Sequence, residues 1–409
     1  MTNLRHLTAS QASQELGISV STLYAYVSRG LIHSEPSGDE KRSRRYLRED
    51  VERLKTRKEQ RRNPAKSAEA ALNWGEPVLE SAITLIENGQ LYFRGRDAVA
   101  LANHQSLEEV AGLIWLGELG AVLFEGDLPE KSLLQFSHLA GLTPIEKFQT
   151  VLSIKSGNDL LAYDLSTQGV ARTGGRILQF MAEMAIPANG KFQDSVATTL
   201  VKGWGLDGEV ARKIINLALV LCTDHELNVS SFTARCVASA GSSPYAVVVA
   251  GLAALQGYKH GGATAKIEAF LNELKIQNNV RATIAARIKR GEHIPGFGHK
   301  LYPKGDPRGK AILAICNQYF PESGAMALGK LVMDEMEQIY SLQPTVDFGL
   351  VILSDVLELP PGSALTLFAL GRTVGWIGQA IEQYEIDALI RPRARYTGVI
   401  PKMDGGRND

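Results

Sequence analysis

The stretch Ile294-Pro-Gly-Phe-Gly-His299-Lys-Leu-Tyr-Pro-Lys-Gly-Asp-Pro-Arg308 places a histidine directly after a glycine-rich turn and an arginine nine residues later. Two prolines and a third glycine bend the chain between them. Two further histidines occupy similarly unusual settings, in Thr223-Asp-His225-Glu-Leu-Asn228 and Lys259-His260-Gly-Gly-Ala263. Since imidazoles donate hydrogen bonds and guanidinium groups bind carboxylates in a fork, this set predicts a pocket for a small anionic substrate.

The composition is that of a globular protein, with 409 residues, of which 44% are hydrophobic and 22% charged. That length accommodates two or three domains. No apolar run reaches the roughly 18–20 residues needed to cross a bilayer, and the N-terminus lacks a signal-peptide pattern. The cysteines Cys222, Cys236 and Cys316 are widely spaced and are predicted to be buried, reduced thiols. We therefore expect a cytoplasmic protein without a membrane partner.

Charge is unevenly distributed along the chain. Residues 1–64 contain 13 Lys and Arg against 8 Asp and Glu, whereas the remainder contains 31 against 36. The formal net charge of zero therefore conceals a balance of +5 in the first part and −5 in the second. This asymmetry predicts a small basic module attached to a mildly acidic body.

The basic module, residues 1–62, has the order of a winged helix-turn-helix domain. Residues 7–32 predict two short helices around a turn at Gly17, the second ending at Gly30. A cation-rich turn and strand follow at residues 38–47, and then a helix over residues 48–62. The order resembles that of MerR/excisionase-type proteins, which implies duplex DNA as a partner.

The resemblance assigns seven residues to DNA binding, on or near the second helix and in the cationic strand region. They are Ser21, Thr22, Tyr24, Lys41, Arg42, Arg44 and Arg45. The cations would lie against phosphates. A solvated basic helix pair used for protein contacts is the alternative. Residues 63–73 predict a linker to the body.

The body, from residue 74 onward, is predicted to be mainly α-helical. Apolar residues recur at helical spacing in segments 106–116, 174–184, 209–222, 244–256, 266–274, 278–290, 309–319, 325–340 and 364–385. The one early strand signal, at residues 82–93, is centred on Asn88-Gly89, a hairpin dipeptide. The absence of alternating β and α units argues against a doubly wound sheet. Gly296-Phe-Gly298 lacks the flanking strand and helix of a dinucleotide fold.

The chemistry of the site can be framed without a metal, since the histidines lack zinc-site spacing and cysteine partners. Arg308, Arg372 and Arg391 would suit a substrate with two carboxylates, and His299 its ketone. The missing component is a base. Asp347 precedes an apolar run, where desolvation would raise its pKa from about 3.9 and improve it as a base. By spacing alone, a helix cap is the more common role for such a residue.

Six motifs then follow one another in order. They are residues 223–228, His260-Gly-Gly-Ala263, residues 296–308, Val346-Asp347-Phe348, Gly371-Arg372-Thr-Val-Gly-Trp376 and residues 391–398. Together they resemble the citrate synthase family over residues 74–400. The resemblance implies a mainly α, two-domain fold, with a large domain of residues 74–263 and 359–409 and a small domain of residues 264–358.

The resemblance also implies a reaction, the condensation of oxaloacetate with an acyl-CoA, most simply acetyl-CoA. Asp347 would abstract a proton from the acyl methyl group, and His260 would stabilise the enol or enolate. His299 would polarise the oxaloacetate ketone and assist protonation. Water would then hydrolyse the citryl thioester. Acyl-CoA would be a substrate, and no cofactor or metal is implied.

The remaining site residues implied by the resemblance bind substrates. Those for oxaloacetate are His225, Arg308, Arg372 and, reaching the other subunit's pocket in a homodimer, Arg391. Those for CoA are Gly296, Gly298 and Lys304.

Several departures from the family pattern fall where CoA phosphates or the acyl group would lie. Thr264-Ala265 replaces the usual Asn-Glu, and Pro303 stands where many relatives have a cation. The lysine often found before the aspartate is absent from residues 340–344, and residues 349–351 are Gly-Leu-Val. Propionyl-CoA, giving 2-methylcitrate, therefore stays open. So does a transcriptional regulator whose body senses oxaloacetate, citrate or CoA.

Overall fold

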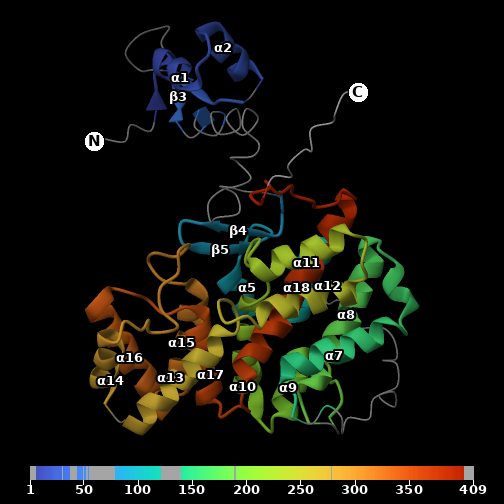
Figure 1. The fold of residues 1–409 in the computed structure, drawn as a ribbon, viewed down its shortest axis with the longest axis vertical. Helices are drawn as coiled ribbons and strands as arrows, with labels where there is room; N and C mark the ends of the chain where they lie inside the picture. The colour runs from blue at the N-terminus through green and yellow to red at the C-terminus, as the bar shows by residue number, and fades with distance from the viewer. Residues whose placement is uncertain are drawn as a thin grey trace, which may run out of the picture. The chain divides into compact units, whose positions relative to one another are not determined.

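The chain forms two compact units, Met1–Glu80 and Ser81–Asp409 (Figure 1). The computed structural model describes residues 6–29, 31–36, 44–48, 50–51, 54, 79–120, 139, 141–187, 190–277 and 279–399. The predicted linker at residues 63–73 lies outside the described residues.

The N-terminal unit contains the predicted helix pair. Helix α1 (Ala9–Leu16) begins with a capping box in which Thr8 and Gln11 satisfy each other's backbone N–H groups, and it ends at Gly17 in a left-handed conformation. Helix α2 (Val20–Ser28) begins at Ser19, whose hydroxyl accepts from the Thr22 backbone. Polar caps therefore set the starts of both helices.

A small antiparallel sheet accompanies the helix pair in this unit. Strands β1 (His6–Leu7), β3 (Arg44–Leu47) and β2 (Ser34–Pro36) pair in that order. Tyr46 of β3 is buried together with Leu16 and Leu23 of the helices. The predicted third helix, residues 48–62, lies mostly outside the described residues, as do Lys41 and Arg42.

The second unit is mainly α-helical, and each of the nine predicted helical segments coincides with a helix. The helices are α5 (Ala98–His104), α6 (Leu107–Leu116), α7 (Pro144–Ser156), α8 (Thr167–Met184), α9 (Val196–Gly203), α10 (Gly208–Leu221), α11 (Val229–Ser239), α12 (Pro244–Leu255), α13 (Ala263–Gln277), α14 (Val280–Lys289), α15 (Pro307–Tyr319), α16 (Gly324–Tyr340), α17 (Val346–Val356) and α18 (Ser363–Ile386), with a short 3₁₀ helix η3 at Leu160–Tyr163. The prediction of a mainly α fold is confirmed.

A three-stranded antiparallel sheet precedes these helices, with strands β4 (Thr84–Glu87), β5 (Gln90–Phe93) and β6 (Arg96–Asp97) in sequence order. The turn between β4 and β5 is formed by Asn88 at φ 53° and Gly89 at φ 77°. Two consecutive positive φ angles define the type I′ turn that Asn-Gly favours. The predicted hairpin is therefore confirmed.

Helix α18 is the central element of this unit, and it contacts α8, α10, α11 and α12 (Figure 1). Most of its residues are buried on every side, including Trp376. Gly371 allows close packing, because a Cβ there would lie 2.3 Å from the Leu219 carbonyl oxygen. The helix therefore lies directly against the end of α10, where the first histidine loop begins.

Three of the earlier expectations can be placed on this fold. Cys222 and Cys316 are free and buried as predicted, but Cys236 is only partly buried, because it faces outward on α11. Within the described residues, no helix is both long and apolar enough to span a membrane. The division of the body at residues 264 and 358 stays a prediction, since Ser81–Asp409 is one unit by its contacts.

Candidate active site

His225 lies in the turn that joins α10 to α11. Asn228 begins α11, and its side-chain oxygen accepts from the backbone N–H groups of Ser230 and Ser231. This cap closes the turn tightly and directs the His225 ring inward, where it is 7% exposed. Its Nε2 lies 2.9 Å from the hydroxyl oxygen of Tyr302.

The loop with His299 is bound to the segment that enters α17. The Thr345 N–H donates to the Gly296 carbonyl at 2.9 Å, and the Gly298 N–H donates to the Gln343 carbonyl at 2.9 Å. Gly296 has a φ of 90°, and a Cβ there would lie 3.1 Å from the Cβ of Phe348. Glycine is therefore required by both backbone conformation and space. These bonds hold the His299 loop beside the first turn of α17.

The rings of His225, His299 and Tyr302 contact one another. The two histidine rings meet edge to face at 5.3 Å, and His299 lies 5.0 Å from the Tyr302 ring. The backbone N–H of Leu301 donates to His299 Nδ1 at 3.2 Å. Because Nδ1 accepts this bond, the proton of a neutral ring is on Nε2. His299 therefore presents a donor, as polarisation of a ketone requires.

His260 lies in the loop between α12 and α13, and its Nε2 is 2.8 Å from the Ser230 hydroxyl oxygen. Its ring packs edge to face on Phe368 at 5.9 Å. Burial, followed by the charges of Arg372 and Arg308, lowers the pKa of His260 to about 3. The ring is therefore neutral at physiological pH, and it can donate a hydrogen bond without carrying charge.

Arg308, at the start of α15, is 3% exposed and pairs with Asp306. Its Nε and Nη2 donate to the carboxylate at 2.9 and 2.8 Å. Burial opposes the Arg308 cation, but the pair with Asp306 outweighs burial and raises the pKa. Asp306 also accepts from the Val346 N–H at 3.1 Å, which ties α15 to α17. The pair therefore fixes a permanent cation next to Asp347.

Arg372, on α18, is the second buried cation, with an exposure of 1%. Its Nε donates to the Cys222 carbonyl at 2.8 Å. Burial lowers its pKa to about 10, so the side chain stays protonated at neutral pH. Within the part of the chain that the structure describes, its Nη2 has no hydrogen-bond partner. Such an unsatisfied donor costs about 1–3 kcal/mol, which an anionic ligand would remove.

Asp347 lies in the first turn of α17 and is half-buried. Desolvation raises its pKa to about 6, and nearby Asp306 adds to the rise while Arg308 and Arg372 oppose it. A carboxylate with a pKa near neutrality is a stronger base than a solvated one and is still ionised at pH 7. Asp347 is therefore the second residue of the helix and not its cap, which is Thr345, and it has the environment of a general base.

The two arginines show that the segments meet at one site. Arg308 and Arg372 both perturb the pKa values of His225, His260 and Asp347. Burial, followed by these cations, lowers the pKa of His225 well below its ordinary value. The structure thus brings together two of the three predicted arginines, all three histidines and the aspartate, from segments between residues 223 and 372. The predicted roles of these residues stay proposals.

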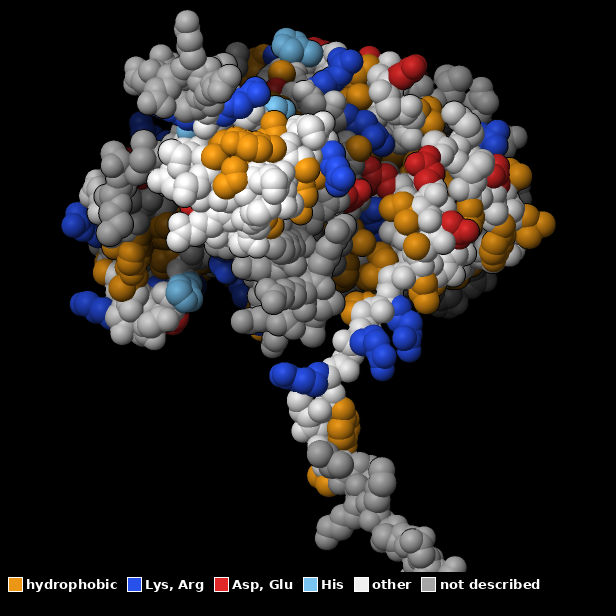
Figure 2. All heavy atoms as spheres, turned by 90° about the horizontal axis from the view of Figure 1, so that it is seen from above, with side chains coloured by type: hydrophobic (Ala, Val, Ile, Leu, Met, Phe, Trp, Pro, Cys, Tyr) orange, Lys and Arg blue, Asp and Glu red, His pale blue; other side chains and the backbone are white. Residues whose placement is uncertain are grey.

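Other predicted residues lie apart from this buried cluster. Gly298 and Lys304 are exposed, and the Lys304 carbonyl accepts from the Lys310 ammonium group at 2.6 Å. Arg391 is exposed in the segment after α18, which extends away from the body with its arginine side chains uncovered (Figure 2). Within this chain Arg391 does not join the cluster, so its predicted reach into a second subunit stays a prediction.

Three further residues support the site and were not singled out from the sequence. Tyr302 hydrogen bonds with His225, Asp306 forms an ion pair with Arg308, and Ser230 hydrogen bonds with His260. Asp306 could have been found as an acidic residue two positions before Arg308, which was predicted to bind oxaloacetate. Ser230 gives no such signal, since a serine in the first turn of a helix is common. No group of three or more His, Cys, Asp or Glu that could hold a metal was found in the residues searched, which are the described ones.

Comparison with known proteins places this chain in a family. The family described as "Citrate synthase, C-terminal domain" matches residues 71–393, and "Helix-turn-helix domain" matches residues 7–59. The chain therefore belongs to the citrate synthase family, as an enzyme of the citrate synthase type with a helix-turn-helix domain at its N-terminus.

Individual relatives agree with this assignment. Citrate synthase from Haloferax volcanii is 30% identical over 357 residues, which cover 79% of this chain and 94% of the relative. A 2-methylcitrate synthase from Corynebacterium glutamicum is 25% identical over 344 residues, covering 76% and 90%. The crystal structure of citrate synthase from Thermotoga maritima superposes with a TM-score of 0.68 at 27% identity, covering 82% of this chain and 98% of that one.

Proposed function

We propose that this protein condenses oxaloacetate with acetyl-CoA to give citrate and CoA. The observation that carries the proposal is the pairing of two buried cations with a base of raised pKa. Arg308 and Arg372 supply positive charge for a dicarboxylate, and the Nη2 of Arg372, which has no hydrogen-bond partner among the described residues, provides a donor. Asp347, with a pKa of about 6, lies next to them and is ionised at pH 7.

The reaction follows from these positions. The Asp347 carboxylate takes a proton from the carbon next to the thioester, while neutral His260 donates to the thioester oxygen, which becomes an enol or enolate. That carbon bonds to the oxaloacetate keto carbon. The Nε2–H of His299 hydrogen bonds to the keto oxygen, which takes up a proton, equivalent to the one removed by Asp347, and so ends as the hydroxyl of the citryl thioester. Water then cleaves the thioester and releases CoA.

The choice of acetyl-CoA over propionyl-CoA is tested by competition. One methylene in a pocket changes discrimination by about 1–3 kcal/mol, or roughly 10–200-fold. The enzyme is given oxaloacetate and equal concentrations of both thioesters, and citrate and 2-methylcitrate are quantified by mass spectrometry. We expect citrate in excess. An excess of 2-methylcitrate would assign the protein to the second activity found among its relatives.

We also propose that the protein is a homodimer with shared active sites. The 3₁₀ helix η3 exposes Leu160, Leu161 and Tyr163 at 80%, 68% and 66%, which is apolar surface that a second copy would cover. Mixing inactive His260→Ala subunits with inactive Arg391→Ala subunits tests this. Recovered activity in the mixture supports a site completed by the partner's Arg391, whereas continued inactivity contradicts it.

For the N-terminal unit we propose binding to duplex DNA, motivated by its helix-turn-helix geometry. Tyr24 on α2 is 54% exposed, and Arg44 and Arg45 are exposed on β3. Ser21 and Thr22 hydrogen bond with the Ser19 hydroxyl in the first turn of α2. Binding should weaken with salt and be lost when Lys41, Arg42, Arg44 and Arg45 are all changed to Ala. Unchanged binding by that variant would contradict the assignment.

The alternative is a transcriptional regulator whose body senses a ligand without catalysing a reaction. Such a protein would bind DNA in a manner that responds to oxaloacetate, citrate or CoA, and it would show no turnover.

A further inference from the structure

Asp224, directly before His225, is a fully buried carboxylate that the proposed reaction does not use. Its Oδ2 accepts from the Thr84 hydroxyl at 2.6 Å and from the Gln379 amide at 3.4 Å, and its Oδ1 accepts from the Ser231 hydroxyl at 3.3 Å. The backbone N–H of His225 also donates to this carboxylate. The shortest of the three side-chain bonds comes from strand β4, 140 residues away in sequence.

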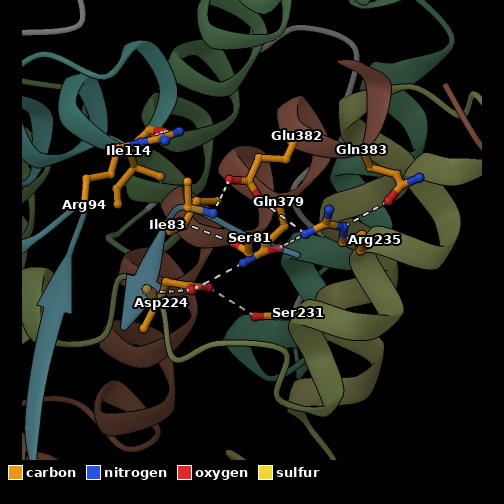
Figure 3. A network of polar contacts seen from close by, with 12 residues as sticks. Ser81, Ile83, Arg94, Ile114, Asp224, Ser231, Arg235, Gln379, Glu382 and Gln383 are labelled. Atoms are coloured by element: carbon orange, nitrogen blue, oxygen red, sulfur yellow. Dashed lines mark hydrogen bonds and ion pairs between the residues drawn. The ribbon is translucent and has the colours of Figure 1, made fainter. Parts of the chain in front are cut away.

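Helix α18 lies directly against this carboxylate. A Cβ at Gly375 would lie 2.7 Å from Asp224 Oδ1 and 2.2 Å from the Thr223 carbonyl oxygen. Gln379, one turn further along, has its side-chain oxygen held by Arg235 at 3.0 Å, so that its amide nitrogen faces Asp224. Figure 3 shows Asp224 directed toward Gln379 and Ser231, with Arg235 beyond Gln379. The same helix carries Arg372, the second arginine proposed to bind the substrate. Asp224 therefore connects the His225 turn with Arg372.

The charges around Asp224 explain why its position matters. Arg372 is the cation that most strongly supports the Asp224 carboxylate, and Asp224 is the anion that most strongly supports Arg372. Arg235 also interacts with this carboxylate, while Glu226 repels it. Burial raises the pKa of Asp224, and Arg372, the Thr84 hydroxyl, the His225 N–H and the Gln379 amide oppose the rise. Without the Thr84 donor, the balance shifts toward the neutral acid.

We propose that Thr84 is a positioning residue for oxaloacetate binding, which acts by fixing the Asp224 carboxylate between the His225 turn and Arg372. The inference rests on the proposed function. Strand β4 and the residues that lead into it are held to the same region by two other bonds, from the Ala82 N–H to Glu382 at 2.8 Å and from the Ile86 backbone to Glu226. Loss of the Thr84 hydroxyl therefore leaves the strand in place and removes only the donor to Asp224.

The test compares Thr84→Val, which keeps the shape and removes the donor, with Thr84→Ser, which keeps the donor. A hydrogen bond to a charged acceptor is stronger than one between neutral groups. We therefore expect Thr84→Val to raise KM for oxaloacetate about fivefold or more. Since the bond acts on binding, kcat should change by less than about twofold. Thr84→Ser should restore KM. Thr150→Val, which removes an exposed hydroxyl on α7 that bonds to the Glu146 carbonyl, is the matched control.

The pH dependence separates positioning from a general loss of structure. The Thr84 hydroxyl lowers the pKa of Asp224, so Thr84→Val raises it, and the carboxylate becomes protonated at a higher pH as the solution is acidified. The rise of KM for oxaloacetate at acidic pH should therefore begin at a higher pH in Thr84→Val than in the wild type. A KM raised equally at every pH would overturn the proposal.

The outcomes also separate this inference from the proposed function. A wild type that releases no CoA refutes the condensation itself before any variant is compared. An active wild type with Thr84→Val indistinguishable from it refutes only the role of Thr84. If Thr84→Val does not fold, as judged by circular dichroism, Thr84→Ala removes the same donor with a smaller side chain and must give the same rise in KM.

Discussion

The two ends of the candidate site differ in burial and in how their charges are held. At the proposed oxaloacetate end, His225, Arg308 and Arg372 are buried, and Asp306 and Asp224 balance the two cations. At the proposed CoA end, Gly298 and Lys304 are exposed. A small dianion needs desolvated, fixed charges to be recognised, whereas a large cofactor-like substrate is bound over an open surface. One departure from the family pattern, Pro303 beside Lys304, falls at the exposed end, whereas Thr264 and residues 349–351 are buried. Substitutions at the buried end are therefore expected to impair the reaction strongly. Substitutions at the exposed end are expected to weaken CoA binding only slightly.

The largest effect is expected from the base. Asp347→Asn keeps the shape and removes proton abstraction, a loss of about 10²–10⁴-fold in kcat. KM for oxaloacetate should change little, because Arg308 and Arg372 remain. Asp355→Asn, on the same helix but in a partly exposed ion pair with Lys275, is the control and should retain activity. Steady-state kinetics of both variants provide the measurement, and an active Asp347→Asn enzyme would remove Asp347 from the mechanism.

The next largest effect is expected at His260. Removing an oxyanion-stabilising donor raises the barrier by about 2.7–4 kcal/mol, so His260→Ala should lower kcat at least about a hundredfold. Thermal unfolding should show a folded protein, since the half-buried ring has one hydrogen bond, to Ser230. Near-normal turnover in a folded variant would mean that His260 does not stabilise the enolate.

A pH profile addresses the same chemistry without a mutation. Desolvation holds the pKa of Asp347 near 6, and only the ionised form is a base. Below that pH kcat should fall about tenfold per unit, and above it kcat should level off. His260, with a pKa of about 3, stays neutral throughout this range. A profile that is flat down to pH 4.5 would contradict a desolvated base.

The smallest effect is expected at the exposed end. Lys304→Ala removes a solvated charge, which contributes about 0–1 kcal/mol, so KM for acetyl-CoA should rise by less than about fivefold. KM for oxaloacetate should be unchanged. A larger rise in KM for acetyl-CoA would show that this loop becomes buried when CoA binds, and the contrast between the two ends would then apply only to the free enzyme.

Local signals in the sequence predicted much of the fold. The polar caps at Thr8 and Ser19, the Asn88-Gly89 turn and the apolar spacing of residues 364–385 all act within a few residues of one another. The family motifs identified the histidines, arginines and aspartate of the site. These features are readable because each depends on nearby residues or on an ordered set of motifs.

Contacts between distant segments could not be predicted in this way. Three hydrogen bonds of the site depend on how the helices pack in three dimensions. They join Thr84 to Asp224, Arg372 Nε to the Cys222 carbonyl, and Ser230 to His260. A backbone carbonyl acceptor leaves no trace in side-chain identity. The raised pKa of Asp347 was anticipated from its apolar neighbours, but the opposing charges of Asp306 and Arg308 became visible only in the folded site.

The central claim is that this site catalyses carbon–carbon bond formation, and release of CoA thiol tests it most directly. The full-length protein is mixed with saturating acetyl-CoA, with and without oxaloacetate, and free thiol is followed with a colorimetric reagent. We predict rapid release that depends on oxaloacetate and on an intact Asp347. No release at saturating concentrations of acetyl-CoA or propionyl-CoA would contradict the account and favour a body that only senses its ligands.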